Sequence, residues 1–347
     1  MATQTLEEIK LKKIAVVMPH WLGDAIMALP AMRYLRKLYP KAHITVVTIK
    51  SLEDLYSQET TIDACLSWNK SKGLGKILSY LQLTSQLRAE NLEMGVLFTN
   101  SFASALILKG TGISYRVGYA KEQRGFLLSH SVPFPQTHRK QHQSLQFLNL
   151  LFSLWDKEEL ADTSTHLLVS KHDRQKARRA MKSWGETGYV GLGIFSAFGP
   201  AKDWSAERYR FLGESLYKMH GLRSVLFGTE KDQSKANFIH RGLEHIFVDL
   251  TGQTTMSELK ALLAECRLYI GNDSGLSHLA AALNIPTIVI FGSTFPEFTR
   301  PLGRRVEVLY AKLACSPCFE RVCPLGTLQC MRDIRVDDVM DAVEEYV

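Results

Sequence analysis

Apolar residues in this chain fall in short continuous runs, and the segments between the runs repeat apolar residues every three or four positions. A run of four to seven apolar residues predicts a buried strand, and the three-to-four spacing predicts a helix. The predicted strands are 14–18, 44–48, 94–98, 189–195, 224–227, 246–250, a strand ending at 270, and 286–292. The predicted helices are 25–39, 77–88, 144–155, 206–220, 256–265 and 336–347.

Strands and helices alternate in two consecutive sets, which predicts two parallel sheets covered by helices. Residues 162–172 separate the sets and favour a linker with a short apolar strand of its own. We therefore expect an α/β protein with two Rossmann-like domains that face one another across a cleft. The expected boundaries are 1–165, 166–335 and a C-terminal helix at 336–347.

The chain length supports a division into two domains, and the net charge indicates which kinds of partner to expect. The chain has 347 residues, too many for one ordinary core, with 46% hydrophobic and 22% charged residues. No apolar run approaches the roughly 20 residues that span a bilayer, and residues 1–13 do not resemble a signal peptide. We expect a cytoplasmic protein. The net charge of +7 favours anionic partners, but no nucleic-acid-binding pattern supports a nucleic acid.

The most informative turn reads Gly-Asn-Asp-Ser-Gly-Leu-Ser-His over residues 271–278, between a strand and a helix. Parallel sheets bind ligands at this edge, and the first N–H groups of the helix favour an anion. Backbone N–H groups of Ser274, Gly275 and Leu276 are therefore predicted to bind a diphosphate, with side-chain donors from Ser274 and His278. Asp273 would repel that diphosphate, so it is expected to hold the turn or bind a sugar hydroxyl.

A second turn, Met-Pro-His-Trp-Leu-Gly-Asp-Ala over residues 18–25, follows the first strand. It has a single glycine and is not a dinucleotide fingerprint. Asp24 either stabilises the helix start or accepts a proton from an attacking hydroxyl as a general base.

Together the motifs at 20–24, with Leu29-Pro30, and at 272–278 resemble the bacterial lipopolysaccharide heptosyltransferases, which use ADP-heptose. The Trp-Leu-Gly-Asp form is more similar to the heptosyltransferase II branch than to heptosyltransferase I. His20 departs from that branch, which usually has Asn or Ser there. Segments 112–118 and 124–128 look like the family's acceptor side. The residues assigned to that side by the resemblance are His20, Trp21, Gly23, Asn100, Ser101, Arg116 and Arg124.

The resemblance implies a GT-B fold and an inverting, metal-independent transfer with no required cofactor. Heptose would move from ADP-heptose to the inner heptose of the lipid A–Kdo core, with Asp24 as the general base. Alternatives within the family are heptosyltransferase I or III, or a transferase for another ADP-sugar. A two-lobed ligand-binding protein and a nicotinamide dehydrogenase are less favoured, because the chain shows neither an export signal nor a three-glycine turn.

The departing ADP needs positive charge, and no Asp-x-Asp metal pair is present at a cleft position. Lys202 lies after the first strand of the second domain and matches the family's Lys-x-Trp motif, with Trp204 expected mainly to pack. Ser196 is predicted to contact a phosphate. Asp232 is predicted to bind the ribose, with Glu230 as the alternative.

On the acceptor side, Arg116, Lys121 and Arg124 either form a basic cluster for core phosphates and carboxylates or are ordinary surface charges. A peripheral contact of residues 6–13 with the inner membrane, and a monomeric state, are also expected. The alternative for residues 6–13 is a frayed terminus.

Four of the six cysteines, Cys315, Cys318, Cys323 and Cys330, cluster near the C-terminus. Four thiolates suit zinc or an iron–sulfur cluster, but the gaps of four and six residues do not match a zinc ribbon. Reduced thiols in an ordered loop are the favoured interpretation, and a structural zinc is the alternative.

Overall fold

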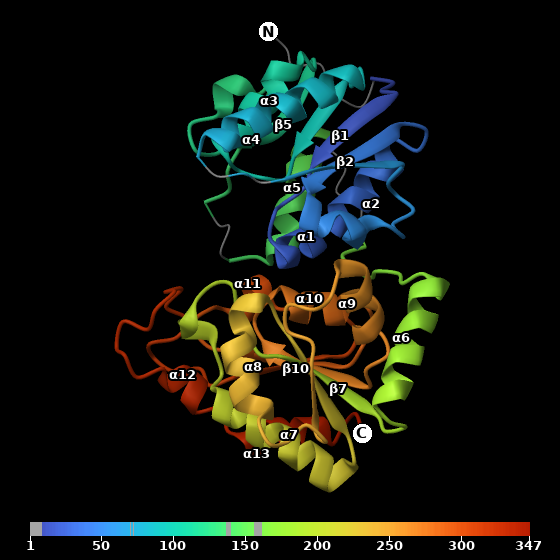
Figure 1. The fold of residues 1–347 in the computed structure, drawn as a ribbon. Coiled ribbons are helices and arrows are strands. Elements are labelled where there is room, and N and C mark those ends of the chain that lie inside the picture. Colours follow the sequence, from blue (N-terminus) through green and yellow to red (C-terminus); the bar gives the residue numbers. More distant parts are fainter. Residues whose placement is uncertain (1–8, 70, 72, 137–139, 156–161) are drawn as a thin grey trace. The chain divides into compact units, whose positions relative to one another are not determined.

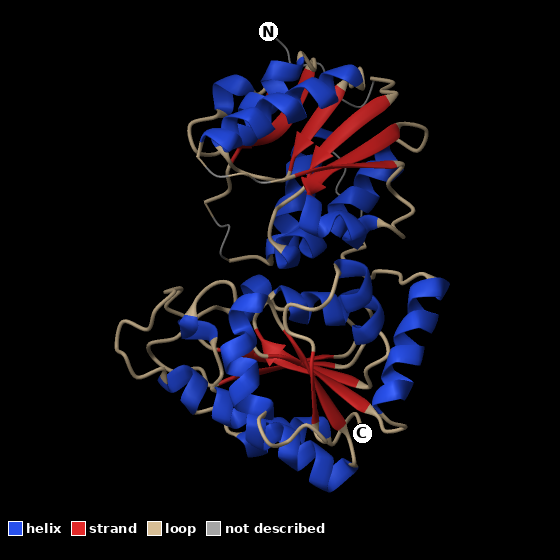
Figure 2. Ribbon diagram, viewed as in Figure 1, coloured by secondary structure: helices blue, strands red, loops and turns tan. Residues whose placement is uncertain are grey.

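The structure is a computed structural model that describes residues 9–69, 71, 73–136, 140–155 and 162–347. The chain divides into two compact units, Met1–Thr163 and Ser164–Val347. Each unit contains one parallel six-stranded sheet with helices on both faces (Figures 1 and 2). The predicted α/β class with two Rossmann-like units is thereby confirmed.

The sheet of the first unit has the strand order β3-β2-β1-β4-β5-β6. Its strands are β1 (Lys13–Val17), β2 (His43–Ile49), β3 (Ala64–Trp68), β4 (Met94–Leu97), β5 (Tyr115–Ala120) and β6 (His130–Pro133). Its helices are α1 (Leu22–Met27), α2 (Leu29–Leu38), α3 (Leu74–Ala89), α4 (Phe102–Thr111) and α5 (Gln143–Trp155), with 3₁₀ turns at Lys50–Tyr56 and Gly125–Leu127. Ile14 of β1 is in register with Ile44 of β2 and Met94 of β4, so β1 is central and buried.

The single helix predicted at 25–39 is wrong, because the structure has two helices that meet at Ala28. The backbone N–H of Ala28 closes α1 on the carbonyl of Asp24. Pro30 has no N–H to continue the ladder and sits in the first turn of α2, where a missing donor costs nothing.

The sheet of the second unit has the order β12-β11-β10-β7-β8-β9. Its strands are β7 (Tyr189–Gly193), β8 (Arg223–Phe227), β9 (Phe247–Asp249), β10 (Leu268–Asn272), β11 (Thr287–Phe291) and β12 (Val306–Tyr310). Its helices are α6 (Lys171–Trp184), α7 (Ala206–His220), α8 (Gln233–His240), α9 (Met256–Leu263), α10 (Gly275–Ala282), α11 (Pro296–Thr299), α12 (Gln329–Arg332) and α13 (Val336–Val343), with 3₁₀ turns at Pro200–Lys202 and Glu230–Asp232.

The link between the units differs from its prediction. Residues 162–170 form no strand, and α6 begins directly after Ser170, whose hydroxyl accepts the N–H of Asp173. The Thr165 hydroxyl donates to the Leu302 carbonyl at 2.7 Å, so the chain already belongs to the second unit at that residue. The C-terminal helix α13 packs on α7, β11 and β12 and is part of the second unit as well.

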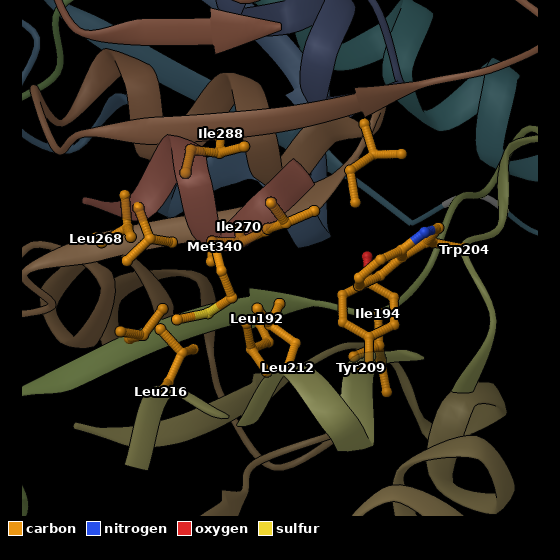
Figure 3. Close-up of a cluster of buried hydrophobic side chains, with 14 of the residues drawn as sticks. Leu192, Ile194, Trp204, Tyr209, Leu212, Leu216, Leu268, Ile270, Ile288 and Met340 are labelled. Atoms are coloured by element: carbon orange, nitrogen blue, oxygen red, sulfur yellow. The ribbon is translucent and has the colours of Figure 1, made fainter. Parts of the chain in front are cut away.

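The core of the second unit lies between its sheet and the layer that contains α7 and α13 (Figure 3). Leu192, Ile270 and Ile288 from the central strands meet Leu212 from α7 and Met340 from α13. This packing fixes the carboxyl ends of β7 and β10, because both strands are fully buried along their length. The polar turns that follow these strands are therefore held on a rigid base.

Candidate functional site

Both sheets place polar turns at their topological switch points. In the second unit the strand order reverses between β7 and β10, and in the first unit between β1 and β4. Open parallel sheets bind ligands outside the carboxyl ends of the strands at such points. The segment from Ser196 to Lys202 follows β7, and the turn of Asp273 and Ser274 follows β10.

Asp273 holds the second-unit turn in place through buried contacts. Its carboxylate is ion-paired with the ammonium of Lys202 and accepts a hydrogen bond of 2.6 Å from the Thr294 hydroxyl. The Thr299 hydroxyl donates to the same oxygen at 3.5 Å. The side chains of Lys202 and Asp273 are only 8% and 4% exposed, so the pair is shielded from water. Asp273 thereby connects the loops that follow β7, β10 and β11.

Two residues that the sequence reasoning missed, Asn272 and Tyr209, also support this turn. The Asn272 side-chain oxygen accepts bonds from the Trp204 N–H and from the Tyr209 hydroxyl, both at 3.1 Å. Ser277 donates to the Asn272 carbonyl at 2.6 Å. A fully buried asparagine at the end of an apolar strand was the available signal, since such a side chain needs partners.

The predicted phosphate contacts lie around the start of α10. Ser274 is the N-cap, and α10 begins at Gly275, so the N–H groups of the first turn have no partner within the helix. The Ser196 hydroxyl donates to the Asp273 carbonyl at 3.4 Å, which places it beside the same turn. His278 is 4% exposed, and its backbone N–H donates to the Ser274 carbonyl. The N–H groups of the first turn of α10 therefore lie at the carboxyl edge of the sheet, beside the Ser196 side chain.

The ribose candidate Asp232 is largely occupied by its own loop. Its carboxylate accepts the N–H and the hydroxyl of Thr229 at 2.7 and 2.8 Å, and the residue is 5% exposed. Glu230, the alternative, is exposed in the same turn. The geometry therefore favours Glu230 over Asp232 for a ligand contact. The other acidic residue nearby, Asp203, has a pKa raised by burial.

Trp204 is fully buried, and its indole N–H donates to the Ile334 carbonyl at 2.9 Å. The prediction that Trp204 mainly packs agrees with this position. The Lys235 ammonium contacts the same loop and donates to the carbonyls of Ile194 and Trp204. Burial lowers the pKa of Lys235.

At the switch point of the first unit, Asp24 lies in the first turn of α1. The N-cap is Trp21, so Asp24 is three residues inside the helix and is not itself the cap. The side-chain amide of Gln143 in α5 donates to one Asp24 carboxylate oxygen at 3.0 Å. Trp21 is 60% exposed, and the His20 ring packs edge-on against Trp68 at 5.7 Å between centroids. In the sequence Gly23 lies between Trp21 and Asp24, in the first turn of α1.

The predicted basic acceptor-side cluster is wrong for Arg124, which is fully buried. Its guanidinium donates to the carbonyls of Tyr119 at 2.9 Å and Ser101 at 3.2 Å, and to the Asn100 side-chain oxygen at 3.3 Å. Burial lowers the pKa of Arg124 to about 10. Arg124 thus ties together the loops after β4 and β5, and Asn100 and Ser101 are its partners.

The other two members of that cluster have separate local contacts. Arg116 donates through Nε to the Leu127 carbonyl at 2.8 Å. The Lys121 ammonium lies 4.1 Å from the centre of the Phe134 ring. The three cations therefore do not present one exposed surface.

Within the described ranges, no helix is both long and apolar enough to cross a membrane. The predicted membrane-contact segment, residues 6–13, lies partly outside the described residues, because 1–8 are not described.

Comparison with known proteins gives a consistent result. The family model for glycosyltransferase family 9 (heptosyltransferase) matches residues 80–329. Lipooligosaccharide heptosyltransferase 2 of Haemophilus ducreyi is 29% identical over 309 residues, which cover 86% of this chain and 88% of that protein. Lipopolysaccharide heptosyltransferase 2 of Escherichia coli is also 29% identical, over 86% of this chain and 87% of its own.

Among solved structures, the E. coli ADP-heptose lipopolysaccharide heptosyltransferase II aligns with a TM-score of 0.83 and 26% identity, over 96% of this chain and 98% of its own. A family 9 glycosyltransferase from Veillonella parvula shares the fold with a TM-score of 0.85 at 21% identity, over 98% of this chain and 99% of its own.

Proposed function

The chain belongs to glycosyltransferase family 9, the heptosyltransferases, and we propose that it is a heptosyltransferase II. In this proposal it moves L-glycero-D-manno-heptose from ADP-heptose to the inner heptose of the lipopolysaccharide core. The observation that carries the proposal is similarity along most of the chain to relatives named heptosyltransferase 2. The positions of Asp24 and of the Asp273–Gly275 turn at the two switch points support it.

The second unit binds the donor in this proposal. The diphosphate of ADP-heptose accepts hydrogen bonds from the backbone N–H groups in the first turn of α10, where the helix dipole favours an anion. Lys202 has three N–H donors, and its bond to Asp273 leaves others for a phosphate oxygen. Asp273 therefore orients Lys202. The Lys202 ammonium in turn lowers the repulsion that the Asp273 carboxylate would exert on the diphosphate.

Asp24 is the proposed general base. The Gln143 side-chain amide donates to the Asp24 carboxylate and orients it, and a carboxylate can accept the proton of a hydroxyl nucleophile. The acceptor hydroxyl loses that proton to Asp24 while its oxygen attacks the anomeric carbon of the donor. The bond from that carbon to the diphosphate oxygen breaks on the opposite face, so the configuration inverts and ADP leaves. The donors at α10 and Lys202 stabilise the charge on the departing diphosphate.

The acceptor is anchored in lipid, so we propose a cytoplasmic enzyme that works at the inner-membrane surface. We also propose that it is a monomer. The net charge of +7 would attract the chain to anionic lipid and to the phosphorylated core. The proposed acceptor-side residues include His20, Trp21 and Gly23, whose turn leads into α1.

The proposal is tested by incubating the protein with ADP-heptose and a set of defined core acceptors, and by measuring ADP release and product mass. Transfer to an acceptor that ends in the inner heptose is the expected result. Transfer only to Kdo-terminated acceptors would indicate heptosyltransferase I instead. No ADP release with any heptosylated or Kdo-terminated acceptor would refute the assignment.

A further inference from the structure

The four clustered cysteines line one small cavity in the second unit. Between β12 and α12 the chain runs through residues 311–328 without a regular element. Cys315, Cys318, Cys323 and Cys330 all line a cavity of about 20 Å³, which is the size of an ion or one to two water molecules. Irregular segments of this length are uncommon in compact domains and are usually functional, and in this one four side chains that can bind a metal line the same cavity.

The four thiols lie close together and are reduced. Cys323 begins a turn that the Gly326 N–H closes on the Cys323 carbonyl at 3.1 Å, and residues of this turn line the same cavity as the other three cysteines. None of the four cysteines is in a disulfide. The other three thiols lie close enough to Cys330 to act on it electrostatically. The four sulfurs therefore occupy one neighbourhood in reduced form.

A buried hydroxyl provides an independent sign of a missing ligand. Ser293 lines the same cavity, is 1% exposed, and its hydroxyl has no hydrogen-bond partner among the described residues. A buried hydroxyl without a partner is costly, and a metal-bound thiolate would supply an acceptor for it.

We propose that Cys315, Cys318, Cys323 and Cys330 bind one divalent thiophilic metal ion through four thiolates. Four sulfur ligands select zinc or iron over magnesium or calcium, which prefer oxygen. Across the described part of the chain, no three His, Cys, Asp or Glu side chains already close on one point. The thiols surround the cavity, so binding requires their side chains to turn inward on the ion.

The ion would position the loops of the candidate active site without touching a substrate. Ala201, next to Lys202, lines the cavity, and its N–H donates to the Arg321 carbonyl at 3.1 Å. The Phe319 N–H donates to the Ser293 carbonyl at 2.7 Å, next to Thr294. The cysteine segment therefore contacts the neighbours of Lys202 and Thr294, two of the three residues that bind the Asp273 carboxylate.

The first test is the metal content of the full-length protein, purified under reducing conditions from medium supplemented with zinc and iron. We expect about one zinc or iron ion per chain by elemental analysis. Cys315→Ser, which changes an exposed residue, and Cys318→Ser should each lose most of the metal. Cys65→Ser, in the first unit and outside the cluster, is the matched control and should keep it.

The second test needs no variant. After removal of the native ion, cobalt(II) should give the intense visible bands of a tetrahedral thiolate complex and protect about four thiols from a thiol reagent. Removal of the ion should also lower the melting temperature by roughly 5 °C or more.

A chain that contains less than about 0.1 ion and gives no cobalt–thiolate bands would overturn the proposal. So would a disulfide between any two of the four cysteines in freshly purified protein. Both readouts are independent of transferase activity, so they do not depend on the proposed function.

Discussion

The buried pair of Lys202 and Asp273 allows a quantitative prediction. Replacement of Lys202 by Met keeps the length of the side chain and removes its charge, so the Asp273 carboxylate stays buried without its cation. Breaking a buried pair on one side costs about 3–5 kcal/mol. Here the hydroxyls of Thr294 and Thr299 still donate to the carboxylate. We therefore expect the lower limit, about 3 kcal/mol of unfolding free energy.

The double variant Lys202→Met/Asp273→Asn separates the missing ion pair from the uncompensated charge. Asn keeps an oxygen for the Thr294 hydroxyl and carries no charge, so the double variant should lose less stability than Lys202→Met alone, under about 2 kcal/mol. Both variants should lose most transferase activity, because both lack the cation.

The assay is urea unfolding of the protein. The unfolding transition of the second unit is monitored by circular dichroism and tryptophan fluorescence. Lys231→Met, which changes an exposed lysine of the same unit, is the control and should be within about 0.5 kcal/mol of the wild type. If Lys202→Met costs less than about 1 kcal/mol, or the double variant costs more than the single one, the reasoning from burial is refuted.

Three further predictions concern the rest of the chain. Asp24→Asn should bind ADP-heptose normally while turnover falls about 100-fold or more, and an active variant would exclude Asp24 as the base. Arg124→Met should cost about 2–3 kcal/mol in urea unfolding, because it leaves buried carbonyls without donors, whereas Arg116→Met should cost less; equal costs would contradict the different burial of the two side chains. The Lys176 ammonium and the Thr255 backbone lower the pKa of Glu258 to about 2. The ionised Glu258 carboxylate therefore contributes fully to the stability of the folded protein above the unfolded pKa of roughly 4.3, and this contribution is lost as pH falls toward 2. The stability difference between wild type and Glu258→Gln should therefore shrink over that interval, and a constant difference would disprove the linkage.

Elements with strong local signals were predictable from the sequence. The helix expected at 206–220 coincides with α7, because Ser205 caps its start and Gly221 adopts the left-handed conformation that ends it. The central strands β1, β10 and β11 were also found, since they are continuously apolar and buried on both faces.

Elements with weak local signals were missed. The edge strand β12 is only half-buried along its length and contains Glu307, so it has no apolar run. Helix α6 buries only Ala177 and Met181, so its apolar stripe is short and most of its residues are charged or polar. The same limit applies to β3, β5 and β6, whose residues are mixed in polarity.

The candidate site divides in the same way. The sequence by itself determined that Asp24 and Asp273 follow buried strands, because strand, turn and helix are specified by neighbouring residues. Only the tertiary structure decided the strand orders that put these turns at switch points, the pairing of Lys202 with Asp273, and the burial of Arg124. Lys202 and Asp273 are 71 residues apart, and their contact exists because β7 lies beside β10. Such contacts depend on how whole strands pair, which no local pattern of hydrophobic and polar residues records.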